Sequence, residues 1–216
     1  MFSRDGVGRP RIGAETLIGS DGLTRNHLTA EGEADGVGFV LDASRMDTDG
    51  YRDHSAAPRD QTFAKLNFKP DEDSKLALIY SSLEQNGTQD PLGQEWEAYK
   101  ADPRSVTANA LSYNTRKSID HQQLGANYER YFGDATLQLT AYAGKRSVTQ
   151  YLSIPKYTPG GTLTPSNNLR GGGVVDFERD FHGGSVRWLQ PVNGVVGTFS
   201  WYWASTMTRA VMIDVV

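Results

Sequence analysis

The chain contains no cysteine, and it has no long uninterrupted hydrophobic run. The absence of cysteine excludes disulfides, and it leaves open both an oxidising compartment and the cytosol. A transmembrane helix needs about 18 or more apolar residues in sequence, so we expect no such helix here. A membrane β-barrel needs no such run, because only alternate residues of its strands face lipid.

Basic residues are not in excess either. The 22 Lys and Arg residues stand against 26 Asp and Glu residues, which gives a formal net charge of -4. This balance argues against a nucleic-acid partner, which favours a basic patch. The first residues, MFSRDGVGRPR, contain no apolar segment of the kind found in a signal peptide. The length of 216 residues is enough for one large domain and does not suggest two.

Motifs for catalysis and metal binding are missing as well. A metal site needs convergent ligands, and the histidines are scattered without an i, i+4 pair. No Gly-x-Ser-x-Gly nucleophile motif is present. We therefore expect a protein that is not an enzyme, with no resident metal and no cofactor. The four histidines are His27, His54, His121 and His182.

The chain is rich instead in segments where apolar and polar residues alternate. The clearest segment covers residues 120–152, which we interpret as two long strands joined by a turn at Gly133 and Asp134. An alternation with a period of two is typical of a half-buried strand. In the second strand one face holds Leu137, Leu139, Ala141 and Ala143, and the other holds Gln138, Thr140, Tyr142 and Gly144.

The same pattern predicts about eight strands in all. Asp35 and Gly36 form a hairpin signal between two of the strands. A short helix is expected over residues 94–101, inside a long connection. Besides the two arms of the 120–152 hairpin, the expected strands cover residues 10–19, 23–32, 36–46, 61–69, 75–83 and 173–189.

After the first turn, at residues 20–22, the lengths of the connections alternate along the chain. They are short at Asp35, at Pro70, at Gly133 and at 190–194, and they are long after Asp47, after Glu84 and at 153–172. In an up-and-down meander, alternate connections emerge on the same side, so all the long loops share one end. Outer-membrane barrels have this asymmetry, with long extracellular loops and short periplasmic turns. We therefore predict an all-β, antiparallel up-and-down meander that forms part of a transmembrane β-barrel.

Several segments, taken in their order and spacing, resemble TonB-dependent outer-membrane receptors of the siderophore type. The resemblance spans about residues 2–194. FSRDG at 2–6 resembles the end of the plug domain that precedes the first barrel strand. The barrel segments that carry the resemblance are DGYRDHS at 49–55, KLNF at 65–68 with the Pro70 turn, TQDPLG at 88–93, TRKS at 115–118 and RSVTQY at 146–151.

This resemblance implies a 22-stranded barrel with a plugged lumen. It also implies uptake of a ferric siderophore across the outer membrane of a Gram-negative bacterium, driven through TonB. Residues 1–9 are then the end of the plug, residues 10–200 part of the barrel, and 201–216 an atypical tail. The TonB box and most of the plug would lie before Met1, and the last strands after Val216. We therefore expect a truncated, non-transporting fragment, whose partners are the ferric ligand, outer-membrane lipid and TonB only through the missing plug.

The tail at 201–216, WYWASTMTRAVMIDVV, loses the alternation. Back-translated in a shifted phase, it can encode an apolar run, then an Asp-rich stretch, then Arg-Arg-Gly. That order resembles another barrel strand that runs into a loop. We hypothesise a frameshift near residues 193–200, and the alternative is a genuine apolar tail.

Ligand binding is expected in the loops. Ferric siderophores are commonly anionic, so arginines supply charge-assisted hydrogen bonds and aromatic residues supply flat faces. Arg146 and Gln150 are an even number of positions from Gln138 and Tyr142, so they lie on the same polar face of the strand. We expect this face to line the lumen. Each candidate has a second interpretation, as part of a hydrogen-bond network in the lumen or as an interfacial aromatic. The candidates are Tyr51, Arg52, His54, Trp96, Tyr99, Arg116, Arg146, Gln150 and Tyr151.

Two other classes of protein stay open. One is a complete small eight-stranded barrel with a structural or adhesive role, which needs edge closure between its first and eighth strands. The other is a soluble all-β binding domain, with two stacked sheets and apolar residues facing inward. The sequence does not distinguish among a siderophore, haem, cobalamin and a carbohydrate as the ligand.

Overall fold

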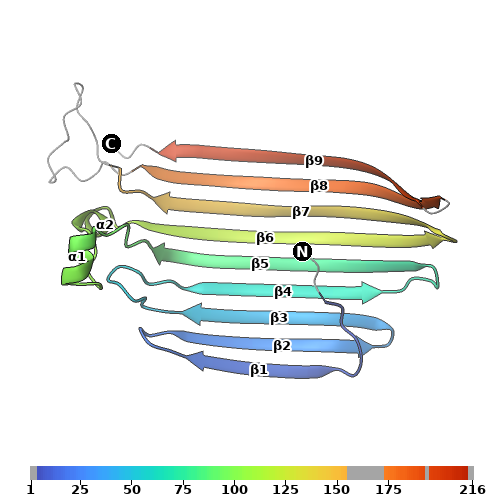
Figure 1. Cartoon of the computed structure of the whole chain (residues 1–216), viewed down its shortest axis with the longest axis horizontal. Coiled ribbons are helices and arrows are strands. Elements are labelled where there is room, and N and C mark those ends of the chain that lie inside the picture. Colours follow the sequence, from blue (N-terminus) through green and yellow to red (C-terminus); the bar gives the residue numbers. More distant parts are fainter. Residues whose placement is uncertain (1–3, 155–172, 193–194, 214–216) are drawn as a thin grey trace.

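Nine strands form one antiparallel sheet, and their order in the sheet is their order in the chain (Figure 1). The computed structural model describes residues 4–154, 173–192 and 195–213, with side chains as far as residue 190. The strands are β1 (Arg11–Ile18), β2 (Thr24–Ala34), β3 (Val37–Asp47), β4 (Arg59–Phe68), β5 (Ser74–Gln89), β6 (Arg116–Phe132), β7 (Ala135–Tyr151), β8 (Val174–Val192) and β9 (Val195–Ile213).

This topology confirms the predicted all-β antiparallel meander. The sheet has nine strands rather than about eight, because the backbone of the tail continues as β9 as far as Ile213. β8 lies between β7 and β9, so the closure of a first strand on an eighth, which the small-barrel alternative needs, is not formed. The described strands make a single sheet, not the two stacked sheets of the soluble alternative. The frameshift hypothesis stays a prediction, because pairing of the backbone does not test the reading frame.

The sheet has one apolar face and one polar face. Leu41, Tyr80 and Leu124 lie in one row of cross-strand partners, and we call the face on which they lie the apolar face. The polar face carries Asp42, Ser81 and Gln123 in the next row. Other side chains on the apolar face include Ile12, Leu28, Leu66, Leu78, Leu139 and Val186.

No other described element covers the apolar face. Ile12 is 85% exposed and Leu124 60% exposed, and Leu28, Leu41 and Val186 are exposed as well. An antiparallel sheet in a water-soluble domain buries its apolar face and leaves its polar face wet. Ion pairs lie on both faces: Lys65 pairs with Asp5 on the polar face, and Arg45 pairs with Asp60 at 3.9 Å on the apolar face. The uncovered leucine, isoleucine and valine side chains are what differs from a soluble sheet.

Apart from the short connection 19–23, the long connections lie at one end of the sheet and the short ones at the other, as Figure 1 shows. Connections 19–23, 48–58 and 90–115 share one end, which we call the loop end. The turns at 35–36, 69–73 and 133–134 share the other, the turn end. The described connections thus confirm the predicted alternation. The predicted long loop at 153–172 and the turn at 193–194 lie almost wholly outside the described residues.

The structure differs from prediction in several places. β6 begins at Arg116, before the expected start at residue 120. β5 runs on to Gln89, past the expected end at residue 83, through an irregularity in register between Gln85 and Thr88. β8 continues to Val192, so residues 190–192 are strand and not turn. The long connection holds the expected short helix as α1 (Trp96–Ala101) and also a second helix, α2 (Ala108–Tyr113), which was not predicted. No helix in the described residues is long and apolar enough to cross a membrane.

Candidate functional site

At the loop end, three connections are joined to one another by hydrogen bonds. The carbonyl oxygen of Asp21 accepts bonds from the amide of Asp49 at 2.9 Å and from Oγ1 of Thr48 at 3.0 Å. The Asp21 carboxylate lies 2.8 Å from the guanidinium of Arg104. The amide of Asp53 in turn donates to the carbonyl oxygen of Arg104 at 3.0 Å. Connections 19–23, 48–58 and 90–115 therefore form one interlocked layer.

Arg52, a predicted ligand-binding residue, fastens this layer. Its Nε donates to the carbonyl oxygen of Ser105 at 3.1 Å, its Nη1 to that of Leu92 at 2.7 Å, and its Nη2 to that of Pro91 at 3.2 Å. A guanidinium has five N–H donors, so at least three are directed at the protein's own backbone. The structure gives Arg52 a structural role, and ligand binding by Arg52 stays a prediction.

His54 has a similar position between two connections. Its Nε2 lies 2.8 Å from the carbonyl oxygen of Thr115, the residue that precedes β6. His54 adopts a left-handed backbone with φ of 53°. Thr115 is 1% exposed, so the contact lies in the inner part of the layer.

The predicted aromatic residues of the loop end are exposed. Trp96 is 66% exposed, and its ring stacks on Tyr99 at 5.5 Å between centroids and 18° between planes. Both residues belong to α1, three positions apart, which places them on one side of that helix. Tyr51 is also exposed, with the Arg104 guanidinium 4.7 Å from its ring centroid. Each of these rings has one face against a neighbour and is otherwise exposed at the loop end.

Arg116 and Tyr151 are direct partners across β6 and β7, and the Arg116 guanidinium lies 3.6 Å from the Tyr151 ring centroid. Their row lies on the parity of the apolar face. The structure therefore separates them from Arg146 and Gln150, which lie on the polar face with Gln138 and Tyr142. For Arg116 and Tyr151 this position at the strand ends favours the interpretation as an interfacial pair.

On the polar face, Arg146 has two neighbours that were not among the predicted site residues. His121 of β6 is its direct partner on one side, and Arg179 of β8 is its partner on the other. Gln150 lies nearer the loop end, between Lys117 and Val175. The sequence carries no signal for these neighbours, because cross-strand register depends on pairing between distant segments.

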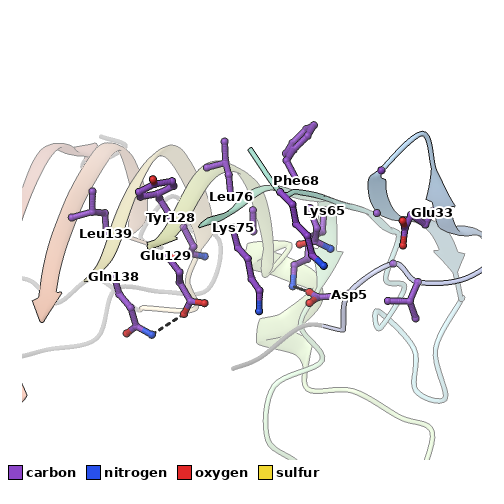
Figure 2. Close-up of a pocket in the computed structure, with 18 residues that line it drawn as sticks. Asp5, Glu33, Lys65, Phe68, Lys75, Leu76, Tyr128, Glu129, Gln138 and Leu139 are labelled. Carbon is purple, nitrogen blue, oxygen red and sulfur yellow. Dashed lines mark hydrogen bonds and ion pairs between the residues drawn. The ribbon is translucent and has the colours of Figure 1, made fainter. Parts of the chain in front are cut away.

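A cavity of about 860 Å³ lies at the turn end of the polar face, far from the predicted loop residues. In Figure 2, Lys75, Glu129 and Gln138 point to one side of the strands, while Leu76, Tyr128 and Leu139 point to the other. Gln138 donates from Nε2 to Oε1 of Glu129 at 2.7 Å, so the sheet's wall of the cavity is itself hydrogen-bonded (Figure 2). The sequence pattern did not single out this cavity.

The segment before β1 closes one side of this cavity. Asp5 contacts Lys65 of β4 at 2.6 Å, and the amide of Glu33 donates to the carbonyl oxygen of Gly8 at 2.8 Å. Gly6 is buried against the backbone of Phe39, where a Cβ atom would collide with main-chain atoms. The N-terminal segment therefore packs on the polar face, in front of the sheet in Figure 1.

Within the part of the chain that the structure describes, no group of three or more His, Asp or Glu side chains is placed to hold a metal ion. Some charged side chains of the polar face contact one another or aromatic rings. Lys75, for example, lies 5.5 Å from the centroid of the Tyr131 ring. The chemistry available on this face is therefore recognition by charge, hydrogen bonds and flat rings.

Comparison with known proteins gives a match in structure. No family model matches the chain. The chain is similar to the unliganded crystal structure of the ferric citrate transporter FecA, with a TM-score of 0.69 and 16% sequence identity. The match covers 93% of this chain and 29% of that one. A structure of the copper transporter OprC matches with a TM-score of 0.39 and 13% identity, over 96% of this chain and 44% of that one.

At this level of identity, the match to FecA concerns the fold. Nearly the whole meander follows a part of the transporter that is less than a third of its length. The predicted fold class, a meander of the kind found in such barrels, is confirmed by this match.

Proposed function

We propose that this chain forms a section of the barrel wall of a TonB-dependent outer-membrane receptor for ferric siderophores. The observation that carries the proposal is the difference between the two faces of the sheet: leucine, isoleucine and valine side chains stand exposed on one face, and polar side chains such as Asp42, Ser81 and Gln123 stand on the other. Both kinds of side chain have a favourable environment when lipid covers the apolar face and an aqueous lumen lies along the polar face. The similarity to a ferric citrate transporter supports an iron complex as cargo.

The chain spans 29% of that transporter's length. We therefore propose that a complete barrel carries out transport and that residues of this chain contribute to ligand recognition. The loop end then faces the cell exterior, with Trp96, Tyr99 and Tyr51 open toward an arriving ligand. The turn end faces the periplasm of a Gram-negative bacterium. We take the segment at Asp5–Gly8, which packs on the polar face, to be the end of a plug. TonB would act through that plug, not through the sheet.

Reconstitution of the full chain into phospholipid vesicles tests the proposal. We expect the chain to resist extraction by alkaline carbonate. In equilibrium dialysis we expect saturable binding of an iron-labelled ferric trihydroxamate, ferric catecholate or ferric citrate. Trp96→Ala should weaken that binding about tenfold, since an exposed aromatic face contributes about 1 kcal/mol or more to ligand contact.

Trp188→Ala is the matched control, because Trp188 lies near the turn end of β8, away from the loops. It should leave binding of the iron complex unchanged. Full extraction by carbonate, or absence of binding for all three complexes, would contradict the proposal.

A further inference from the structure

The apolar face is apolar only in the part nearer the turn end. Toward the loop end, the row that holds Leu124 is followed by two rows in which every side chain from β4 to β8 is polar. We call these two rows the polar collar. The first row consists of Thr62, Ser82, Gln122, Lys145 and Asp180, and the second of Asp60, Glu84, Asp120, Ser147 and Glu178.

The polar collar is charged and open to its surroundings. The side chains of Lys145 and Asp180 are 84% and 64% exposed, and their charged groups lie 3.7 Å apart. The side chain of Asp60 is 50% exposed and lies 3.9 Å from that of Arg45 on β3. Charged side chains destabilise a membrane barrel where they face lipid. The polar collar is therefore suited to water and not to hydrocarbon.

The strands that carry the polar collar are longer than a membrane requires. β6 and β7 have 17 residues each, and β8 has 19. A tilted strand crosses the hydrocarbon of a bilayer with about 9–11 residues. Residues 124–132 of β6 and 135–143 of β7, which lie on the turn side of the polar collar, already match that length. Residues 116–123 and 144–151 of the same strands are therefore in excess of one crossing.

Aromatic rings mark the other border of the apolar part. Phe132 of β6 and Trp188 of β8 lie on the apolar face near the turn end, with 5.7 Å between ring centroids. Aromatic residues flank the apolar band of a membrane barrel at both interfaces. The apolar part thus ends at an aromatic pair on the turn side and at the polar collar on the loop side.

The border of the polar collar slopes across the sheet. On β3 the last apolar side chain toward the loop end is Ala43, which lies in the same row as Asp180 of β8. On β8 the apolar part ends at Val186, or at Gly184 if the glycine is included, six or four positions turnward of Asp180. Over the five steps from β3 to β8, this shift corresponds to an inclination of about 30–40°, at about 3.3 Å per residue and about 4.8 Å between strands. Strands of bacterial outer-membrane barrels are tilted by a similar angle, about 35–45°.

The turns shift in the same direction, whatever their side chains. Leu41 and Ala143 lie in one row of the sheet. Val37, which follows the turn at 35–36, is four positions turnward of Leu41, and Ala135, which follows the turn at 133–134, is eight positions turnward of Ala143. The line of turns and the border of the polar collar therefore slope alike, as two parallel surfaces of one bilayer require.

We propose that the bilayer covers only the turn-side part of the apolar face, up to a sloping border that passes between Leu124 and Gln122 on β6. The polar collar stands beyond this border, in water on the loop side of the membrane. The inference rests on the proposed function, since it takes the apolar face as the side that contacts lipid. It specifies how much of that face the lipid covers.

This position of the bilayer raises the loop end. Residues 116–123 of β6 lift it roughly 20 Å above the border, at about 3.3 Å per residue along a tilted strand. Arg116 and Tyr151, which lie loopward of the polar collar, are then surrounded by water, so the inference replaces the interpretation of this pair as interfacial. The interlocked connections that Arg52 fastens are held clear of the lipid headgroups, where a dissolved ligand reaches them from the side as well as from above.

An environment-sensitive dye on single cysteines tests the border along one strand. The chain has no cysteine of its own, so each variant carries one label. In dioleoylphosphatidylcholine vesicles, a nitrobenzoxadiazole label at Leu139, Ala141 or Ala143 should emit at shorter wavelength than one at Lys145, Ser147 or Thr149. All six positions lie on the same face of β7, so a step between 143 and 145 reports the border alone.

A pair of labels in one row tests the slope. Ala43 and Asp180 are joined by an unbroken row of cross-strand partners. The label at Ala43 should emit as in lipid, and the label at Asp180 as in water. Equal emission at these two positions would overturn the sloping border.

Two lysine variants give a measurement without a dye. Ala141→Lys should lower the ratio of carbonate-resistant to extracted chain at least about tenfold, because it places a charge in lipid. Ser147→Lys is the matched control on the same face of β7, and it should leave this ratio unchanged. Equal losses in the two variants would overturn the inference.

The dye also separates this inference from the proposed function. Lipid-like emission at all six positions of β7 would show that the bilayer covers the whole face. That result would overturn the inference and leave the proposed function standing. Water-like emission at all six positions would contradict both, since no part of the apolar face would then contact lipid.

Discussion

Nη1 of Arg52 donates a 2.7 Å hydrogen bond to the carbonyl oxygen of Leu92, across two connections that are distant in sequence. With the bonds to Pro91 and Ser105, this contact holds the long connection over the sheet. We predict that Arg52→Ala loosens connection 90–115 by about 2–4 kcal/mol, since each hydrogen bond contributes about 1 kcal/mol net. Amide hydrogen exchange of the connection measures this change.

Lys100→Ala is the control for that experiment. Lys100 belongs to the same connection but makes an exposed contact with Glu97 at 2.8 Å, within α1. It should leave exchange nearly unchanged, because exposed ion pairs contribute little. Unchanged protection in Arg52→Ala would contradict the structural role of Arg52.

The contact between Asp5 and Lys65 gives a second prediction. The Lys65 side chain is only 9% exposed, whereas that of Asp5 is 63% exposed. Asp5→Asn removes a carboxylate from a nearly buried ammonium group, and it should release the N-terminal segment by on the order of 1 kcal/mol. Faster exchange of the Glu33 amide, which donates to Gly8, reports the release. Glu72→Gln, in an exposed turn, should leave that amide unaffected; equal exchange in the two variants would contradict the role of Asp5.

Neighbouring residues on β6 give a matched pair of variants for the two faces. Leu124→Arg places a charge on the apolar face, and Gln123→Arg places the same charge on the polar face. In phospholipid vesicles, Leu124→Arg should destabilise the chain by about 2–4 kcal/mol, while Gln123→Arg should have little effect, because only the first exposes the charge to lipid. Urea unfolding midpoints measure the difference. Similar midpoints for the two variants would be inconsistent with lipid contact at Leu124.

The strands were predictable because alternation is a local property. Segments such as 36–46 and 135–151 were found nearly to their ends, since each turn carries residues suited to it, such as Asp35 and Gly36, both with positive φ. β5 was predicted too short because the irregularity between Gln85 and Thr88, with Gly87 at φ of 68°, interrupts the alternation. β9 was not expected as a strand, because pairing with β8 overrides a poor local pattern.

The site was less predictable than the fold. Parity alone placed Arg146 and Gln150 on the polar face. It could not show that Arg179 is the cross-strand partner of Arg146. The length of the connection between β7 and β8 does not fix the register of these two strands. The hydrogen bonds of Arg52 were equally hidden, since they join segments that approach each other only after the sheet has formed.

The central claim is that the apolar face contacts lipid and the polar face contacts water. Because the chain has no cysteine, single cysteines can be placed at each position from 137 to 143 on β7 and spin-labelled without background. In vesicles, labels at Leu137, Leu139, Ala141 and Ala143 should be accessible to oxygen, and those at Gln138, Thr140 and Tyr142 to a water-soluble nickel complex. An accessibility profile with a period of two is the result predicted here; a profile without that period, or with the phases exchanged, would contradict it.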